Sequence, residues 1–589
     1  MKSFLQRLRQ RKIVQWAIAY AAAGWLLLQV FDLVAEQFLW PVWIRQAATV
    51  LVLFGLLVTI VLAWYHGERG RQRVGAVEFI LIVVLLVLGG QSVWLLRDKS
   101  FGGPTDIETS GTSFRETPPP SDSVAVLPCL NLGADDSQSY FADALAAELN
   151  TRLSAVGGLR IPSHTSSFGF KNKDFAIEDI ASSLRVRHVL ECDVSGDESR
   201  IKVSARLIDA QSGYTLWTES YDRGRENLFD VQQEVAFAVV ENLDIRLGGE
   251  ERLLVERRWT DNAEAYDHFL RGIRYQISPP TPTNVAEART HLEHAVELDP
   301  NFGRAYARLA IHWVVVGNYL MAPPDEAYAH VERLALRALE LDNELSEAYW
   351  ALGWAKFAGR FDWQGAERDF RRVIELAPGE FQGYHSLGFV LGVMGDIANA
   401  MRAARIAIDL DPLAFWPRRG LDVLYVRQRD YEAAIGVVES IAELQGWFPL
   451  MRARFALLLA LAEREAAARK HLAQIPIQTS DDPKTKLFVA MNLSTLVYDE
   501  KALTIAEKFA KQWDRSDTYV SAGSLAAIYA ELGDAERAMF WLEKSRENYD
   551  IMILFLDFPS FDNLRGNPRF AEFIKVLQLP EDVYLSTSA

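Results

Sequence analysis

The chain has 589 residues, of which 50% are hydrophobic, and a formal net charge of −16. A chain of this length should contain several domains, and its negative charge argues against a nucleic-acid partner, because nucleic-acid binders carry a basic domain or stripe. Only two cysteines are present, which excludes a cysteine-rich zinc framework and a disulfide-dense scaffold.

Three apolar runs occur near the amino terminus, at about residues 13–31, 47–64 and 76–96. Each run approaches the roughly 20 residues that a helix needs to cross a bilayer. Tryptophans near the run ends are typical of the membrane interface. We therefore predict a membrane region over residues 1–97 with three transmembrane helices. A cleavable signal peptide is the alternative for the first run, but no small-residue cleavage site follows it before the second run.

The charges between these runs predict their orientation. Arg69, Arg71 and Arg73 lie between the second and third runs, whereas the loop at 36–45 is nearly neutral. The positive-inside rule then places the amino terminus and the Arg loop in the cytoplasm. Three crossings predict a bacterial inner (plasma) membrane protein whose soluble C-terminal region lies in the periplasm. If the first run does not span, the soluble region lies on the opposite side.

A linker rich in Gly, Ser, Thr and Pro follows at residues 98–122, with too few apolar residues to build a core. Strand-like and helix-like segments then alternate over residues 123–250. This alternation predicts a small α/β domain with a mixed sheet covered by helices. One of the expected strands is the segment 158–164, GLRIPSH.

Several short motifs in this region resemble the TolB-like amino-terminal domain family of bacteria. They are SVAVLPCLNLG, SYFADALAAEL, HTSSFGFKNK, HVLECDVS and RLIDAQSGYTLWTESYDR, in this order. The resemblance implies an accessory or scaffolding module, often followed by tetratricopeptide (TPR) repeats, and it brings no catalytic residues. Some relatives carry a winged-helix or nucleotide-cyclase domain ahead of the membrane span, where this chain has its three apolar runs.

The clearest repeat is the segment 384–412, YHSLGFVLGVMGDIANAMRAARIAIDLDP. Its apolar and small residues follow helical spacing on two successive segments, which are separated at Gly395 and end at Pro412. Two such helices are typical of a TPR unit, which must stack on neighbours to bury its apolar face. Similar units recur at about the 34-residue period, so we predict an all-α TPR solenoid over residues 260–580. The signature weakens between about 449 and 514.

A solenoid of this type presents a concave groove lined by the first helix of each repeat. Aligning Gly272, Ala310, Gly353 and Gly388 assigns the groove-facing residues by register. The candidate partner-binding residues are Arg304, Ile311, Trp350, Trp354, Phe357, His385 and Phe389. Clustered Trp and Phe beside Arg is the composition of a binding hot spot. The alternative is that these aromatic side chains pack between adjacent repeats.

The two cysteines, Cys129 and Cys192, fall near the C-terminal ends of the first and third predicted strands. These strands would be neighbours in a parallel βαβ arrangement. In an oxidising compartment the two residues can form a disulfide. The alternative is two unlinked cysteines that behave as small buried hydrophobes.

No nucleophile motif, phosphate-binding loop or complete metal-ligand set stands out in the sequence. His291 and His294 lie three residues apart on a predicted helix, but no third ligand accompanies them. The sequence therefore predicts an α+β multidomain chain that is not an enzyme and needs no cofactor. We expect a membrane-anchored scaffold or assembly factor of the bacterial envelope that binds protein partners, with its oligomeric state left open. The alternative is a signal-transducing membrane receptor whose TolB-like and TPR parts sense a ligand or partner.

Overall fold

The computed structural model divides the chain into two compact units, residues 1–116 and residues 117–589. It describes residues 119–133, 139–171, 173, 175–196, 200–224, 228–278, 281–319, 321–475, 500–512 and 520–586, together with Val52. The three predicted membrane spans lie outside the described residues, except for Val52. Among the described residues, no helix combines the length and the apolar character that a membrane crossing requires.

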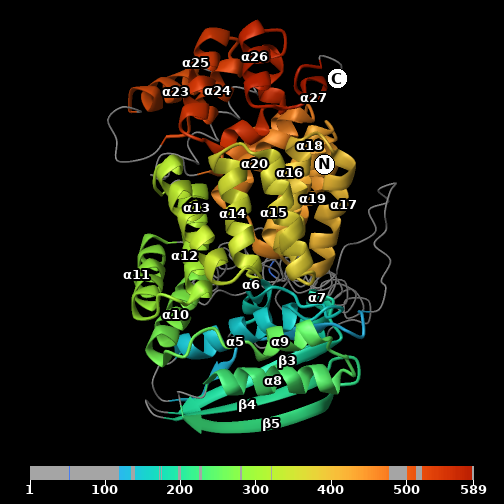
Figure 1. The fold of residues 1–589 in the computed structure, drawn as a ribbon. Coiled ribbons are helices and arrows are strands. Elements are labelled where there is room, and N and C mark those ends of the chain that lie inside the picture. Colours follow the sequence, from blue (N-terminus) through green and yellow to red (C-terminus); the bar gives the residue numbers. More distant parts are fainter. Residues whose placement is uncertain are drawn as a thin grey trace, which may run out of the picture. The chain divides into compact units, whose positions relative to one another are not determined.

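A five-stranded sheet forms the base of the second unit (Figure 1). Its strands are β1 (Val124–Val126), β2 (Leu130–Asn131), β3 (His188–Gly196), β4 (Arg200–Asp209) and β5 (Tyr214–Gly224). Strands β1 and β2 pair with β3 in parallel, whereas β3–β4 and β4–β5 are antiparallel. The predicted small mixed sheet is confirmed.

Helices cover one face of the sheet from β1 to β5 and the opposite face near β1 and β3. They are α5 (Ser139–Ser154), α6 (His164–Phe168), α7 (Ile177–Leu184), α8 (Leu228–Asn242) and α9 (Gly249–Glu256). Val124 and Val126 belong to the core that contains α5, whereas Ala125 belongs to the core that contains α7. Successive side chains of a strand point to opposite faces, so the three-residue run of β1 is buried on both sides.

The expected strand at 158–164 is reduced to a single parallel bridge between Ser123 and Arg160. Pro162 explains the difference, because a proline has no backbone N–H to continue the ladder. Ser163 then caps helix α6 by accepting a hydrogen bond from the backbone N–H of Ser166. Ser and Thr at this position favour a helix start over a strand.

Helix pairs make up most of the remaining chain (Figure 1). The pairs are α10 (Ala263–Gln276) with α11 (Pro282–Leu298), α12 (Gly303–Asn318) with α13 (Pro324–Leu341), α14 (Ser346–Gly359) with α15 (Trp363–Leu376), α16 (Phe381–Val393) with α17 (Ile397–Leu410), α18 (Phe415–Arg427) with α19 (Tyr431–Gln445), and α20 (Pro449–Leu461) with α21 (Glu465–Leu472). This is the expected TPR-like helical repeat region. The pair α20–α21 lies where the sequence signature weakens.

Small residues bring the two helices of a pair close together. A Cβ atom added at Gly353 on α14 would lie 2.5 Å from the Phe370 ring of α15. Real Cβ contacts are not that short, so α14 and α15 can pack at this distance only with glycine at the position. The alignment of glycines in the sequence therefore marks helix-to-helix contact.

The C-terminal segment closes the array. It consists of α23 (Glu500–Gln512), α24 (Ala522–Glu531), α25 (Ala535–Glu547), η3 (Ile551–Phe555), η4 (Pro559–Leu564), α26 (Pro568–Val576) and α27 (Glu581–Tyr584). The tail contacts α24 and α25, as a cap would, and it also returns to the central repeats. The Tyr584 hydroxyl donates to the Val393 carbonyl at 3.0 Å, and the Trp363 indole N–H donates to the Leu577 carbonyl at 2.8 Å.

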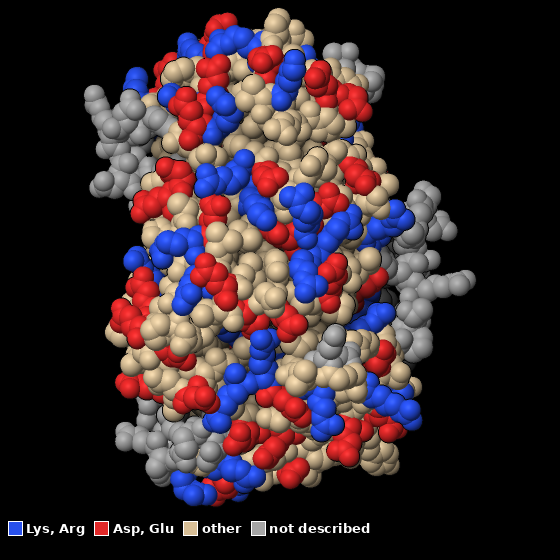
Figure 2. Space-filling model, viewed as in Figure 1, with Lys and Arg blue, Asp and Glu red and all other residues tan. Residues whose placement is uncertain are grey.

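Charges of both signs are interspersed on the face shown in Figure 2. Many charged side chains of the repeats form pairs within one helix, such as Arg371 with Glu367 at 2.8 Å and Arg337 with Glu340 at 3.1 Å. Exposed pairs of this kind contribute little to stability.

Candidate functional site

The α/β unit packs across one edge of the helical array, where the second helix of a pair ends and the next first helix begins (Figure 1). Helix α5 lies between the sheet and α10, so it is buried on almost every side. The Tyr140 hydroxyl on α5 donates to the Asp267 carboxylate on α10 at 2.6 Å. Asp143 pairs with Arg274 at 3.1 Å and with Lys171. Tyr140 and Asp143 of α5 therefore face the helical repeats and not solvent.

A buried cluster of four charges lies at this contact. The Arg304 guanidinium at the start of α12 pairs with Glu148 of α5 and, at 3.0 Å, with Glu347 of α14. Glu347 also accepts from Arg308 at 2.7 Å. Although burial opposes the charge, the carboxylates of Glu148 and Glu347 raise the pKa of Arg304. The cluster joins three elements that are distant in sequence.

A second contact follows along the same edge. The Asp411 carboxylate at the end of α17 accepts hydrogen bonds from the Ser163 backbone N–H at 3.1 Å and from the Ser166 hydroxyl at 2.6 Å. Burial raises the pKa of Asp411, while the hydrogen bonds from the serines oppose that shift. A Cβ atom at Gly379 would lie 3.0 Å from the Leu159 carbonyl oxygen. The backbones of the two parts are thus in close contact.

A cavity of about 140 Å³ lies between these two contacts. Its apolar lining from the repeats includes Ile311, Trp350, Val373 and Phe381. The Trp350 indole N–H donates to the Ser386 hydroxyl at 3.0 Å, which holds the ring in place. Polar residues supply most of the remaining lining, among them Asn150, Thr151, Ser154, Ser346 and Gln382, so this cavity is more polar than the usual small-molecule site.

Four titratable side chains line the same cavity: His164, Arg308, Glu347 and Glu380. Burial, and then the charge of Arg308, lower the pKa of His164 to about 4, so the ring is neutral at pH 7. Burial, and then the neighbouring Glu347 carboxylate, raise the pKa of Glu380 to about 7. Perturbed pKa values in a cleft are a feature of functional sites, although structural ion pairs also produce them.

The structure places the predicted groove residues in two groups. Arg304, Trp354, Phe357 and His385 are buried, which corrects their expected exposure on an open groove. The Trp354 ring of α14 lies edge-on to Phe370 of α15, with ring centroids 6.2 Å apart, and 6.5 Å from the ring of Phe389 on α16. This is the alternative in which aromatic side chains fill the space between helices, because adjacent first helices lie too close to leave these rings exposed.

The other predicted groove residues, Ile311, Trp350 and Phe389, are partly exposed. They lie on three successive first helices, α12, α14 and α16. Ile311 and Trp350 also line the cavity. Binding of a partner at these residues stays a prediction.

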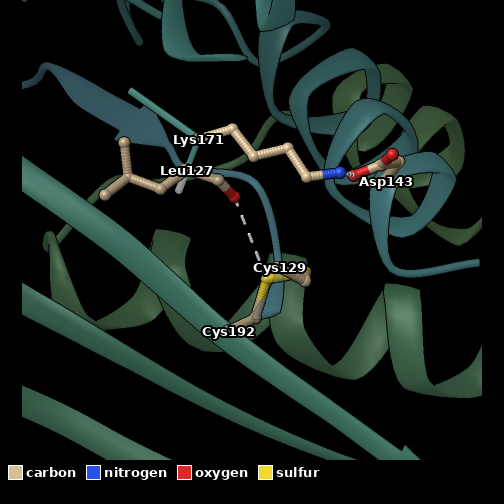
Figure 3. Close-up of a disulfide and its surroundings, with 5 residues drawn as sticks. All are labelled: Leu127, Cys129, Asp143, Lys171 and Cys192. Atoms are coloured by element: carbon tan, nitrogen blue, oxygen red, sulfur yellow. Dashed lines mark hydrogen bonds and ion pairs between the residues drawn. A yellow bond between two sulfur atoms is a disulfide. The ribbon is translucent and has the colours of Figure 1, made fainter. Parts of the chain in front are cut away.

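The sulfur atoms of Cys129 and Cys192 are joined in a disulfide (Figure 3). Their Cα atoms lie 4.6 Å apart, within the range that disulfides favour. Cys129 lies between β1 and β2, and Cys192 lies in β3, which pairs with both. The bond therefore links the segment between β1 and β2 to the neighbouring strand β3 at one edge of the sheet. It lies next to the Lys171–Asp143 ion pair.

The structure adds a third histidine to the two noted in the sequence. His268 on α10 lies with its Nδ1 atom 3.0 Å from Nδ1 of His291, and its ring stacks on His294 with centroids 5.1 Å apart. Across the described ranges, no group of three His, Cys, Asp or Glu side chains has the geometry to hold a metal ion. The histidines serve here as packing between α10 and α11.

The sequence did not reveal Glu148, His164, Glu380 or Asp411 as interface residues. Glu148 and Asp411 have the polar character of solvent-exposed helix positions, and their burial is explained by the contact between the α/β part and the repeats. His164 lies in the motif HTSSFGFKNK, which was noted for its resemblance alone. An acidic residue at the start of a helix, as at Glu380, is ordinary for its interaction with the helix dipole.

Comparison with known proteins gives limited overlap. No family model matches the sequence. A protein of Rhizobium meliloti (strain 1021) named putative adenylate cyclase 3 is 34% identical over 258 residues, which cover 43% of this chain and 44% of that protein. The chain thus matches less than half the length of this relative. The name of this relative contradicts our prediction that the chain is not an enzyme.

Solved structures with similar folds include TPR proteins. PilF of Pseudomonas aeruginosa has 17% identity and a TM-score of 0.30, covering 38% of this chain and 97% of its own. A TPR protein of Thermus thermophilus has 16% identity and a TM-score of 0.29, covering 33% of this chain and 98% of its own. Yeast Tom70 has 15% identity and a TM-score of 0.34, and the match covers 60% of this chain and 82% of Tom70. These scores are too low to support an argument about function.

Proposed function

We propose that this chain is a membrane-anchored scaffold whose helical repeats bind protein partners. The observation that carries the proposal is the apolar track of Ile311, Trp350 and Phe389. One of these partly exposed side chains lies on each of three successive first helices. Large apolar and aromatic residues at regular spacing suit a partner that lies along the array.

The anchoring and location extend this proposal. The apolar runs at 13–31, 47–64 and 76–96 support a membrane anchor, and the motifs from 123 onward support a TolB-like domain. The arginines between the second and third runs support a periplasmic soluble region at the inner membrane. A C-terminal fusion to alkaline phosphatase, which is active only after export, tests the location. An inactive phosphatase fusion would refute this location if a second C-terminal fusion, to a protein that fluoresces only in the cytoplasm, is fluorescent.

Partner binding is tested by affinity capture of the full chain after chemical crosslinking. Ile311→Ser and Phe389→Ser should each lose the captured partner. Matched controls are Leu336→Ser and Ile406→Ser, which change exposed apolar residues on second helices. Loss of the partner in the controls, or its retention in both groove variants with unchanged folding, would count against the scaffold.

A second candidate function is nucleotide cyclisation, favoured by the name of the Rhizobium relative. The test is incubation of the purified full chain with ATP and Mg²⁺ or Mn²⁺, followed by measurement of cyclic AMP. Formation above that of a heat-inactivated sample supports this candidate, and formation equal to it excludes adenylate cyclase activity under those conditions. A receptor function, in which the soluble part senses a ligand, is compatible with either result.

A further inference from the structure

One carboxylate of the cavity between the α/β unit and the repeats lacks a partner. Among the described residues, the Glu380 carboxylate forms no hydrogen bond and no ion pair within 4.0 Å. Glu380 precedes α16, next to Phe381 and facing the same cavity as Trp350. Glu380 is partly exposed and neither of its carboxylate oxygens is fully buried, so this unpaired group can be reached by a solute that enters the cavity.

The other charges around the cavity are already matched. Arg304 pairs with Glu148 and Glu347, and Arg308 pairs with Glu347. His164, the remaining titratable side chain of the lining, is neutral at pH 7. Two positive charges therefore face three carboxyl groups, and the pKa of Glu380 near 7 means that its negative charge is left over above that pH. A ligand that balances this site carries one positive charge.

The walls of the cavity suit the rest of such a ligand. Trp350 and Phe381 provide aromatic surface, and Ile161, Ile311 and Val373 provide aliphatic surface. Aromatic faces attract cations, with tryptophan the strongest. A volume of about 140 Å³ admits a molecule of a few carbon atoms.

We propose that this cavity binds a small organic ammonium ion. The ammonium group donates hydrogen bonds to the Glu380 carboxylate, and its carbon chain lies against Trp350 and Phe381. Because the lining comes from both the α/β unit and the repeats, the bound ion would stabilise their contact. The inference shares Ile311 and Trp350 with the partner-binding track, but it does not rest on partner binding, because it depends on Glu380 and on a small ligand.

An anion is the competing occupant. The Nε atom of Arg308 is buried without a hydrogen-bond partner in the described residues, and α14 and α16 start without side-chain caps. Both features favour negative charge. However, Arg308 already shares its charge with Glu347, and an anion would be repelled by the unpaired Glu380. We therefore expect a cation to bind and an anion to bind less well.

The test compares three probes of nearly equal shape: n-butylammonium, n-butanol and n-butyrate. The thermal unfolding midpoint of the purified full chain is followed against probe concentration at constant ionic strength. A ligand that binds the folded state raises this midpoint, and the dependence on concentration yields an apparent dissociation constant. Butylammonium should raise the midpoint, and butanol and butyrate should not.

Two variants locate the effect. Glu380→Gln keeps the shape of the side chain and removes the charge, so affinity for butylammonium should fall by about tenfold or more. Glu439→Gln removes another carboxylate whose pKa is raised by burial, on α19 outside the cavity, and should leave the affinity unchanged. An equal response in Glu380→Gln, or a larger response to butyrate than to butylammonium, would overturn the proposal.

The dependence on pH gives an independent reading. Butylammonium keeps its charge between pH 6 and 9, so a change in affinity over that range reports on the protein. Glu380 gains a proton as the pH falls through about 7, which should weaken binding at pH 6 relative to pH 8. The partner capture described above should be unaffected by Glu380→Gln, so failure of either proposal can be recognised separately.

Discussion

Replacement of Arg304 by methionine should destabilise the protein far more than removal of either of its acidic partners. The Arg304 side chain is 1% exposed, and that of Glu148 is 0% exposed. Without the guanidinium, Glu148 loses its ion pair and keeps only the longer-range attraction of Arg152, and its Oε1 atom already lacks a hydrogen-bond partner among the described residues. Removing one member of a buried pair in this way costs about 3–5 kcal/mol.

Removal of Glu148 is expected to cost much less. In Glu148→Gln, Arg304 keeps two hydrogen bonds to Glu347, at 3.0 and 3.1 Å. The loss is then closer to that of a single hydrogen bond, about 1 kcal/mol. Glu347 in turn keeps Arg308 when Arg304 is removed, so the damage in the methionine variant falls on Glu148.

The measurement is urea unfolding of the full chain, followed by far-UV circular dichroism. The first transition is the one to compare, because a chain with several units need not unfold in one step. The double variant Arg304→Met/Glu148→Gln should recover part of the loss, since it leaves no unpaired charge. If the unfolding free energies of Arg304→Met and Glu148→Gln differ by less than about 1 kcal/mol, the asymmetry expected from these contacts is refuted.

Three other contacts can be tested in the same protein. Denatured, unreduced protein should show no free thiol, and two reactive thiols would contradict the disulfide. The double variant Cys129→Ser/Cys192→Ser should lose roughly 4 kcal/mol of unfolding free energy by the loop-entropy estimate. Gly353→Ala should destabilise by about 1–3 kcal/mol through its helix contact, whereas Gly436→Ala, with no atom near the added Cβ, should gain about 0.5–1 kcal/mol in the same urea assay. Burial lowers the pKa of His385 to about 3, so the stability contributed by its neutral ring is complete above about pH 6.5 and is lost as the pH falls toward 3. His385→Gln should therefore reduce the loss of unfolding free energy between about pH 6.5 and pH 3. An unchanged slope of unfolding free energy against pH would contradict the lowered pKa of His385.

The helical repeats and the mixed sheet were predictable because their signals are local. The spacing of apolar and small residues in segments such as 384–412 repeats within one or two helical turns, and it does not depend on distant parts of the chain. The strand at 158–164 was mispredicted for a similarly local reason. Its apolar residues suggest a strand, whereas Pro162 and Ser163 end it and start a helix.

The candidate site was predictable only in part. Register along the first helices assigned Trp350 and Trp354 to one surface, but it could not show that Trp354 is buried and Trp350 lines a cavity. Which of two neighbouring aromatic side chains is covered depends on how closely adjacent helices pack. That distance is set by residues from other repeats.

The kinds of element in this chain follow from its amino acids alone, because hydrophobic period, turn residues and proline stops act over a few residues. The cover that the α/β unit forms over the helix ends, and the cavity enclosed there, arise from tertiary packing. Glu148 and Arg304 are 156 residues apart, and neither has an unusual sequence context. A charge becomes energetically distinctive when another part of the fold excludes water from it, as at Arg304.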